Sequence, residues 1–304
     1  MKTYDFMGQR KLAILFSVIL LTVAIGSLAV QQLNWGLDFT GGTLVEVNYS
    51  ETADLNAVRK TLDTEGYAGA IVVSFGTDRD VLIRLPKGYS DAQGAELLAT
   101  LEAAYDGTVE LRRIEFVGPQ VGDELREQGG LAMLLALGLV MLYIAFRFQF
   151  KFAVGAVVAL IHDVLVVLGF FSVTGMEFDL TVLAALLAVI GYSLNDTIVV
   201  SDRIRENFRK LRKVEPVEVI NISLSETLGR TLVTSLTTML VLMALALFGG
   251  DMINAFAIAL LVGVFIGTYS SIYVAANALL IMGVNKEDLM IPVKEGSEQE
   301  EIVP

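Results

Sequence analysis

Six stretches of the chain are apolar enough and long enough to cross a membrane as helices. Each approaches the ~20 residues that span about 30 Å of hydrocarbon. They cover residues 12–30, 131–146, 152–173, 180–200, 231–248 and 255–282. The first stretch is longer than the roughly 7–15 apolar residues of a signal-peptide core, so we expect a retained membrane helix rather than cleavage after Ala29. The pattern predicts a polytopic α-helical membrane protein with six transmembrane helices.

A long polar insert separates the first two apolar stretches. Residues 43–49 and 79–85 alternate between apolar and polar, and residues 70–75 and 108–117 also have the composition of strands. Residues 54–65 have helical spacing that ends at Gly66, and Ser90 is placed to cap a helix that runs to about Tyr105. The order βαββαβ is typical of a ferredoxin-like α+β sandwich.

Basic residues mark every second connection between the apolar stretches. They are Lys2, Arg10 and Lys11 before the first stretch, Arg147 and Lys151 between the second and third, and Arg203, Arg205, Arg209, Lys210, Arg212 and Lys213 after the fourth. Residues 175–179 and 249–254 contain no lysine or arginine. This asymmetry places both termini in the cytoplasm and the insert in the periplasm, across the cytoplasmic (inner) membrane. For the run after the fourth stretch, retention of topology is favoured over a dedicated lipid or protein dock.

The same pattern divides the chain into four parts. Residues 1–30 form a cytoplasmic N-terminus and the first helix, and residues 31–130 form the periplasmic domain. Residues 131–284 form a five-helix membrane bundle, and residues 285–304 form an acidic cytoplasmic tail.

Composition narrows the possible functions. The chain has 304 residues, a mean hydropathy of +0.63 and 18% charged residues, below the ~25% of soluble domains. A net charge of −12 argues against nucleic-acid binding, so protein or lipid partners are expected. With no cysteine and one histidine, we expect no metal site and no cofactor.

Ionisable and amide side chains inside the apolar stretches are the candidates for function, because a charge there costs at least about 2.5–3.5 kcal/mol. His162 and Asp163 lie in the middle of the third stretch. Asn195 and Asp196 lie in the fourth, and Glu226 and Arg230 lie at the start of the fifth.

Asp196 and Arg230 are expected at a similar depth, because the fourth and fifth stretches run in opposite directions from one cytoplasmic connection. A carboxylate that loses its arginine partner in an apolar setting takes up a proton, so the pair can carry protons. A static ion pair between helices is the alternative. For Asp163 the functional and structural interpretations are balanced, because His162 lies beside it. For Glu226 we expect an i,i+4 ion pair with Arg230.

Two further patterns predict packing more than chemistry. The fifth stretch carries a series of hydroxyls, which most often bond to carbonyls of their own helix, although they could also order water. They are Thr227, Thr231, Thr234, Ser235, Thr237 and Thr238. Small residues recur every four positions in the sixth stretch, at Ala259, Gly263, Gly267 and Ser271, which favours close helix packing.

Several segments together resemble the SecF family of the bacterial Sec export machinery, within the resistance-nodulation-division superfamily. Residues 34–43 are similar to its signature at the start of the external domain, with Gly36, Asp38, Gly41 and Gly42 as structural positions. Residues 117–125 are similar to its segment before the second helix. Residues 191–207, which begin at Gly191, and residues 226–231 are similar to its intramembrane motifs.

The resemblance implies an accessory subunit that works with SecD and uses the proton motive force to promote late stages of preprotein export. Its other implied partners are the SecYEG channel and, indirectly, SecA, together with the translocating preprotein and membrane lipids. Asp196 and Arg230 match the family's essential intramembrane pair, and we include Asn195 and Asp163 in the expected proton relay. Six helices form one half of a superfamily transporter, so SecD or a second copy of the chain is expected to supply the other half.

Three other functions remain possible from the residues. A small-molecule or lipid exporter of the same superfamily would need a sizeable apolar pocket. A scaffold of the Sec complex would use Asp196 and Arg230 for assembly alone. An enzyme is the least favoured, because the sequence has no nucleophile beside a plausible base and no phosphate-binding glycine loop.

Overall fold

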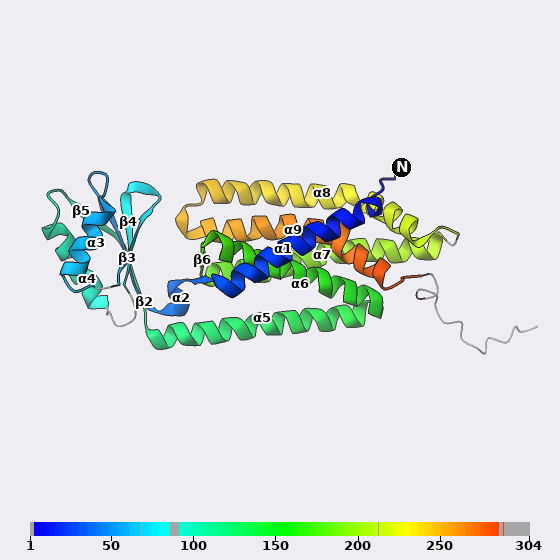
Figure 1. The fold of residues 1–304 in the computed structure, drawn as a ribbon, viewed down its shortest axis with the longest axis horizontal. Helices are drawn as coiled ribbons and strands as arrows, with labels where there is room; N and C mark the ends of the chain where they lie inside the picture. The colour runs from blue at the N-terminus through cyan, green and yellow to red at the C-terminus, as the bar shows by residue number, and fades with distance from the viewer. Residues whose placement is uncertain (1–2, 68, 86–90, 212, 286–287, 289–304) are drawn as a thin grey trace, which may run out of the picture.

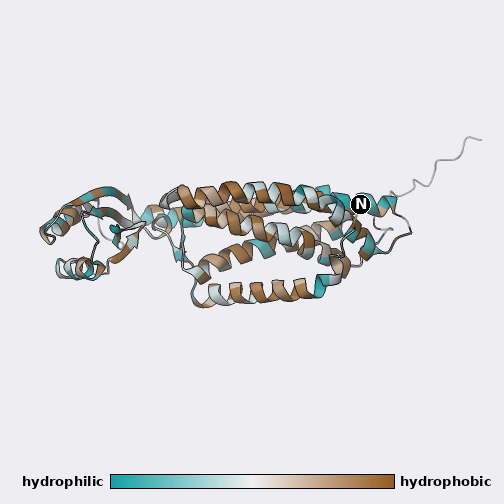
Figure 2. Ribbon diagram, turned by 90° about the horizontal axis from the view of Figure 1, so that it is seen from above, coloured by the Kyte–Doolittle hydropathy of each residue, from teal (hydrophilic) through white to brown (hydrophobic). Residues whose placement is uncertain are grey.

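The protein consists of a long helical bundle with a smaller α+β unit at one end (Figure 1). The computed structural model describes residues 3–67, 69–85, 91–211, 213–285 and 288. Within these residues, six helices are long and apolar enough to cross a membrane. They are α1 (Arg10–Val30), α5 (Pro119–Arg147), α6 (Phe150–Thr174), α7 (Leu180–Lys210), α8 (Pro216–Phe248) and α9 (Asp251–Ile281). Apolar residues follow the whole length of the bundle in Figure 2, which confirms the predicted multi-pass membrane protein.

Three of these helices extend well beyond the apolar stretches that predicted them. Helix α5 begins at Pro119 rather than near residue 131, α7 continues to Lys210, and α8 begins at Pro216. Hydropathy marks the part of a helix that matches the hydrocarbon, whereas the polar turns at either end continue the same backbone hydrogen bonds. Residues 119–130, which the sequence pattern assigned to the insert, therefore belong to the helix that enters the bundle.

The α+β unit has the predicted order of elements. These are β2 (Gly42–Tyr49), α3 (Leu55–Thr64), β3 (Ile71–Phe75), β4 (Thr77–Leu85), α4 (Asp91–Ala103) and β5 (Val109–Val117). The four strands form an antiparallel sheet in the order β3-β4-β2-β5. Asp54 caps α3 by accepting from the backbone N–H groups of Asn56 and Ala57. Ser90, predicted to cap α4, lies outside the described residues.

One apolar face of this sheet is covered by α3 and α4. Alternate residues of β2 and β4 point toward these helices, and Val45, Val47, Val81 and Ile83 are fully buried there. The opposite face carries the intervening, more polar residues. The unit therefore has a core of its own, separate from the core of the bundle.

A short joint connects the α+β unit to the bundle. Strand β1 (Asn34–Trp35) pairs in parallel with β6 (Glu177–Phe178), which lies in the connection between α6 and α7. The four-residue helix α2 (Leu37–Thr40) follows and leads into the sheet. The first and third helices of the bundle are thereby fastened to each other at this end.

Helices α7 and α9 form the centre of the bundle, and α1, α5 and α8 lie at its periphery with many exposed apolar side chains (Figure 1). Close approach of α7 and α9 depends on the small residues of α9, because Gly263 faces Val189 and Gly267 faces Ser193. This confirms the packing role predicted for the small-residue stripe.

Replacing Gly263 by alanine should destabilise the bundle. A Cβ atom at this position would overlap with Val189, so α7 and α9 must separate, and overpacking of this kind costs about 1–3 kcal/mol. Thermal unfolding of the detergent-solubilised chain measures the loss. Gly138→Ala on α5, where a Cβ meets nothing within 4 Å, is the matched control and should leave the melting temperature unchanged or raised. Equal melting temperatures for the two variants would contradict this packing.

The α+β unit should lose stability in acid through Asp80. Its pKa lies below the usual value because Thr77 Oγ1 and Asn48 Nδ2 donate hydrogen bonds to the carboxylate. Burial raises the pKa and attraction by Arg112 lowers it, but both effects are smaller than those of the hydrogen bonds. This stabilisation is present above the unfolded-state pKa of about 3.9 and is lost as the pH falls through the lower folded-state pKa. Hydrogen exchange of β4 in the full chain, corrected for intrinsic rates, should show protection that falls below this pH. Asp80→Asn should lack this pH-dependent part, and an unchanged profile in the variant would refute the assignment.

Candidate functional site

Helix α7 turns its two neighbouring polar residues in different directions. Asp196 points inward and is 5% exposed, whereas Asn195 lies on the exposed face. Among the described residues, Asp196 Oδ2 has no hydrogen-bond partner although it is fully buried. A buried side-chain oxygen without a hydrogen-bond partner is rare in proteins.

Arg230 of α8 does not form the ion pair with Asp196 that the sequence allows. Its guanidinium acts electrostatically on Asp196, but in the described part of the chain it makes no ion pair within 4 Å, and its side chain is exposed. The neighbouring residue Thr231 is buried beside the same carboxyl group, and its Oγ1 also has no partner in that part of the chain. The structure thus contains the separated form of the predicted pair.

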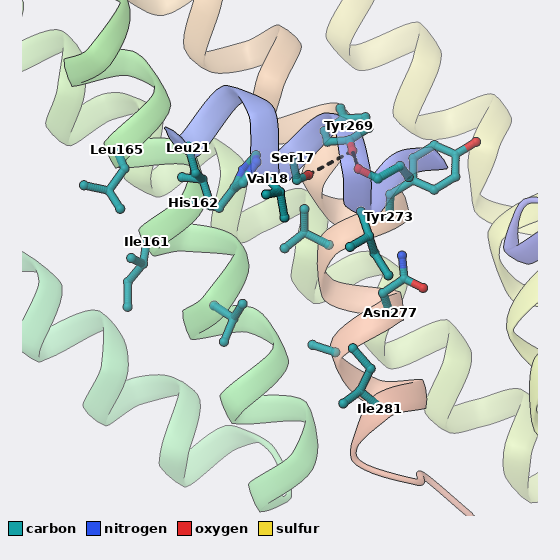
Figure 3. Close-up of a pocket in the computed structure, with 15 residues that line it drawn as sticks. Ser17, Val18, Leu21, Ile161, His162, Leu165, Tyr269, Tyr273, Asn277 and Ile281 are labelled. Atoms are coloured by element: carbon teal, nitrogen blue, oxygen red, sulfur yellow. Dashed lines mark hydrogen bonds between the residues drawn. The ribbon is translucent and has the colours of Figure 1, made fainter. Parts of the chain in front are cut away.

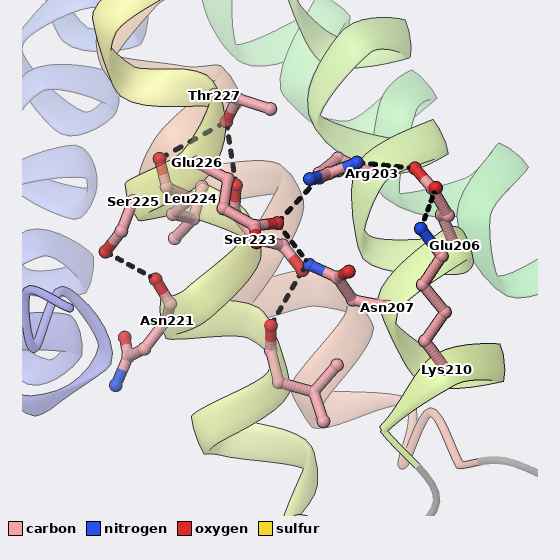
Figure 4. Close-up of polar contacts among 11 residues, drawn as sticks. Arg203, Glu206, Asn207, Lys210, Asn221, Ser223, Leu224, Ser225, Glu226 and Thr227 are labelled. Carbon is pink, nitrogen blue, oxygen red and sulfur yellow. Dashed lines mark hydrogen bonds and ion pairs between the residues drawn. The ribbon is translucent and has the colours of Figure 1, made fainter. Parts of the chain in front are cut away.

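The predicted ion pair between Glu226 and Arg230 is wrong. Glu226 Oε2 instead accepts from Arg203 Nε at 2.6 Å and from Asn207 Nδ2 at 2.7 Å, both on α7 (Figure 4). A partner on the facing helix is reached more directly here than one on the same helix, because Glu226 lies on the face of α8 that packs against α7. These bonds tie the C-terminal turns of α7 to the N-terminal turns of α8, and Glu226 forms no ion pair with Arg230.

Arg230 lines a hollow of about 380 Å³ between α7 and α8. Charged side chains of both signs also line the hollow, namely Asp202, Arg203, Glu206 and Glu226. The hollow reaches from the polar end of the bundle to the level of Arg230, one residue before Thr231. It gives the guanidinium a polar setting away from Asp196.

Asp163 of α6 is fully buried, and its carboxylate has three partners. Ser193 and Ser270 donate through their hydroxyls, the latter at 2.7 Å, and His162 Nδ1 lies 2.9 Å from Oδ1. The tautomer that donates from Nδ1 satisfies the carboxylate and leaves Nε2 without a partner among the described residues. The group joins α6, α7 and α9, which fits a carboxylate that holds helices together.

Sequence reasoning missed Ser193 and Ser270 as members of this group. Ser193 lies three residues before Asp196 on α7, so one helical turn separates the Asp163 cluster from the Asp196 carboxyl group. That spacing is visible in the sequence. Nothing in the sequence, however, places α9 and its Ser270 against α6.

Most hydroxyls of α8 bond to their own helix, as predicted. Thr227, Thr234, Thr237 and Thr238 each donate to a carbonyl three or four residues earlier. Ser235 differs, because its Oγ lies 2.7 Å from Thr268 of α9 and accepts from Tyr192 of α7. These hydroxyls therefore contribute mainly to helix packing.

The glycine-rich segment predicted as a structural motif forms the joint. Gly36 begins α2, and a Cβ there would meet Asp179 at 2.9 Å. Gly41 and Gly42 have φ values of 66° and 130°, which disfavour other residues. Asp38 Oδ2 accepts from the backbone N–H of Leu180, so this motif caps the first turn of α7.

The remaining motif residue, Gly191, lies on the exposed face of α7, and a Cβ there would meet nothing within 4 Å. Asn195 lies one turn further along the same face. The structure therefore gives Gly191 no packing role inside the chain. No group of three or more histidine or acidic residues that could hold a metal ion occurs in the residues that the structure describes.

Two family models match the chain. The model described as "Protein export membrane protein SecD/SecF, C-terminal" matches residues 97–285, and the "SecD/SecF GG Motif" model matches residues 26–53, which contain the joint.

Curated relatives match over nearly the full length. Protein translocase subunit SecF of Vibrio alginolyticus is 50% identical, over 99% of this chain and 97% of that protein. The same subunit of Pseudomonas aeruginosa is 53% identical over 95% of each chain, and that of Escherichia coli O157:H7 is 44% identical over 100% of this chain and 96% of its own length.

Two solved structures of SecDF are also similar. The crystal structure of SecDF from Thermus thermophilus, described as a translocon-associated membrane protein, is 39% identical with a TM-score of 0.84 over 92% of this chain. SecDF in a super-membrane-facing form is 39% identical with a TM-score of 0.70 over 93%. In both cases the chain spans 39% of the SecDF chain. The conserved length, the two motif regions and the shared fold together establish that the chain belongs to the SecF family of SecD/SecF protein-export membrane proteins.

Proposed function

We propose that the chain acts as an accessory subunit of the Sec protein translocase and couples export to the proton motive force through Asp196. The subunit role follows from the SecF relatives, which are translocase subunits rather than enzymes. The coupling role rests on one observation, the buried carboxyl oxygen of Asp196 that has no partner in the described residues while Arg230 stands apart. Such an acid gains a proton when separated and loses it when paired.

The energy available for this step is adequate. One charge that moves through 100 mV releases about 2.3 kcal/mol, which shifts a two-state equilibrium roughly fiftyfold. Paired and separated states of Asp196 and Arg230 would differ in the position of α8 relative to α7. Thr231 supplies a hydroxyl beside this carboxyl group.

SecD is the proposed partner. The SecDF structures contain more than this chain, and they combine the two names in one polypeptide. The face of α7 and α8 that carries Gly191, Asn195 and Arg230 is exposed and includes polar groups that are unfavourable in lipid. A second half-bundle from SecD packed here would cover these groups.

The proposed topology follows the basic residues. Both termini and the α7–α8 connection lie in the cytoplasm, and the α+β unit lies in the periplasm of a cell with an inner membrane. The order of its strands supports a ferredoxin-like fold. In that position the unit would contact a preprotein that leaves the SecYEG channel after SecA has driven it in.

Two alternative functions make different demands on Asp196 and Arg230. A small-molecule or lipid exporter would use a pocket beside the coupling residues, but the apolar cavity between α1, α6 and α9 has neither Asp196 nor Arg230 among its lining residues. A scaffold would need these two residues for assembly alone.

Replacing Asp196 by asparagine should abolish the part of export that depends on the proton motive force, because an amide carries no proton. Release of a secreted protein from energised membrane vesicles that contain SecD and the channel measures this step. Glu218→Gln, which removes an exposed carboxylate in the first turn of α8 outside the hollow around Arg230, is the matched control and should retain it. A protonophore should stop the wild-type step, and removal of sodium should not.

Three results would contradict this coupling role. Normal release by the Asp196 variant removes it directly. Loss of the SecD complex in that variant supports the scaffold, and dependence on sodium assigns the coupling to another ion.

The exposed face of α7 should contact SecD. The chain has no cysteine, so a single cysteine at Asn195 can carry a benzophenone label without background. Illumination of membranes with co-expressed SecD should give a cross-linked product of the two proteins. A label at Ile161, which is 50% exposed on α6, should give none or far less. Equal yields at both positions, or a product with a second copy of the chain in place of SecD, would overturn this interface.

A further inference from the structure

An apolar cavity of about 320 Å³ lies between α1, α6 and α9 (Figure 3). Neither Asp196 nor Arg230 lines it, whereas His162, the partner of Asp163, does. Its walls include Val18 of α1, Ile161 of α6 and Tyr273 of α9. Tyr269 closes one side, because its hydroxyl donates to the Ala13 carbonyl and lies 2.9 Å from Ser17 Oγ. No charged side chain is among the described lining residues, so the space suits an uncharged chain.

The long dimension of the cavity is parallel to the acyl chains of a surrounding bilayer. Its lining extends from Ala13 to Leu21 on α1 and from Tyr269 to Ile281 on α9, which at 1.5 Å per residue corresponds to roughly 12 and 18 Å along the helices. All three helices are candidate membrane spans, so the long direction of the cavity is parallel to the hydrocarbon chains of the bilayer. Val18 and Ile161 are each at least half exposed at its margin, where the cavity opens to the membrane.

Two basic residues, Arg10 and Lys11, begin α1 just before the residues of that helix that line the cavity. Arg10 precedes Ile14 and Ser17 by four and seven residues, so it lies on the same face of α1 one turn beyond the lining. Neither Arg10 nor Lys11 forms an ion pair within the part of the chain that the structure describes. Lys151, the basic residue at the start of α6, is already bonded to Asp288 and to the Gly283 carbonyl.

We propose that this cavity binds one acyl chain of an anionic phospholipid, whose phosphate pairs with Arg10 and Lys11. The apolar walls account for the chain, and the charges of Arg10 and Lys11, which make no ion pair with the described residues, account for the headgroup. The bound lipid completes the packing between α1 and the helices α6 and α9. This site is independent of the coupling role of Asp196.

The test is retention of defined lipids by the purified full-length chain. The chain is reconstituted in nanodiscs with equal amounts of phosphatidylglycerol and phosphatidylcholine of the same acyl chains, then released and analysed by native mass spectrometry. We expect one retained phosphatidylglycerol per chain. Val18→Trp, which fills the cavity, should lower retention by roughly tenfold. Leu236→Trp on the exposed face of α8 is the matched control and should retain the lipid.

The headgroup is tested separately. Arg10→Gln should reduce the preference for phosphatidylglycerol by roughly fivefold, whereas Lys213→Gln, which removes the same charge at the same end of the bundle, should not. Ile161→Trp repeats the cavity test from α6 if the Val18 variant fails to fold. Equal retention by the cavity variant and its control, or equal retention of the two lipids by the wild type, would overturn the proposal.

Discussion

The energy of a carboxylate in a low-dielectric interior governs the arrangement of this bundle. Asp163 and Asp196 lie in the same helical core, but their carboxyl groups differ in how many hydrogen-bond partners they have. Asp163 accepts from two serines, lies 2.9 Å from His162 Nδ1 and joins three helices, so its oxygens are hydrogen-bonded. Asp196 has a buried oxygen with no partner in the described chain. The two carboxyl groups therefore differ in their hydrogen bonding, and this difference supports the coupling role that we propose for Asp196.

Helix α7 connects Asp196 to the joint with the α+β unit. Asp38 of the joint caps the first turn of α7, and Asp196 lies sixteen residues further along, about 24 Å at 1.5 Å per residue. The joint itself is short, and α5 packs closely against it. A Cβ atom at Gly122 of α5 would lie only 2.8 Å from the backbone nitrogen of Gly41. A displacement of α7 would therefore be passed to the sheet through hydrogen-bonded backbone rather than absorbed in a flexible loop.

Periodicity predicted most of this architecture, since apolar length marks each membrane helix and alternation marks each strand. It failed at the helix ends, because the polar turns at residues 119–130 and 201–210 carry no signal that separates helix from connection. It also identified Asp163, Asp196 and Arg230 as buried or membrane-level polar groups. It gave the wrong partner for Glu226, since spacing along one helix contains no information about Arg203 and Asn207 on the facing helix.

Arg230 shows why the single chain is an incomplete unit. A guanidinium exposed to hydrocarbon costs at least about 2.5–3.5 kcal/mol, and Asn195 and Gly191 add further unfavourable backbone and amide surface on the adjoining face of α7. The hollow between α7 and α8 relieves part of this energy by bringing polar groups to the level of Arg230. The rest must be relieved by protein or water outside the chain. The exposed polar groups of α7 and α8 thus lie next to Asp196 in the sequence, so the surface proposed for SecD adjoins the residue proposed for coupling.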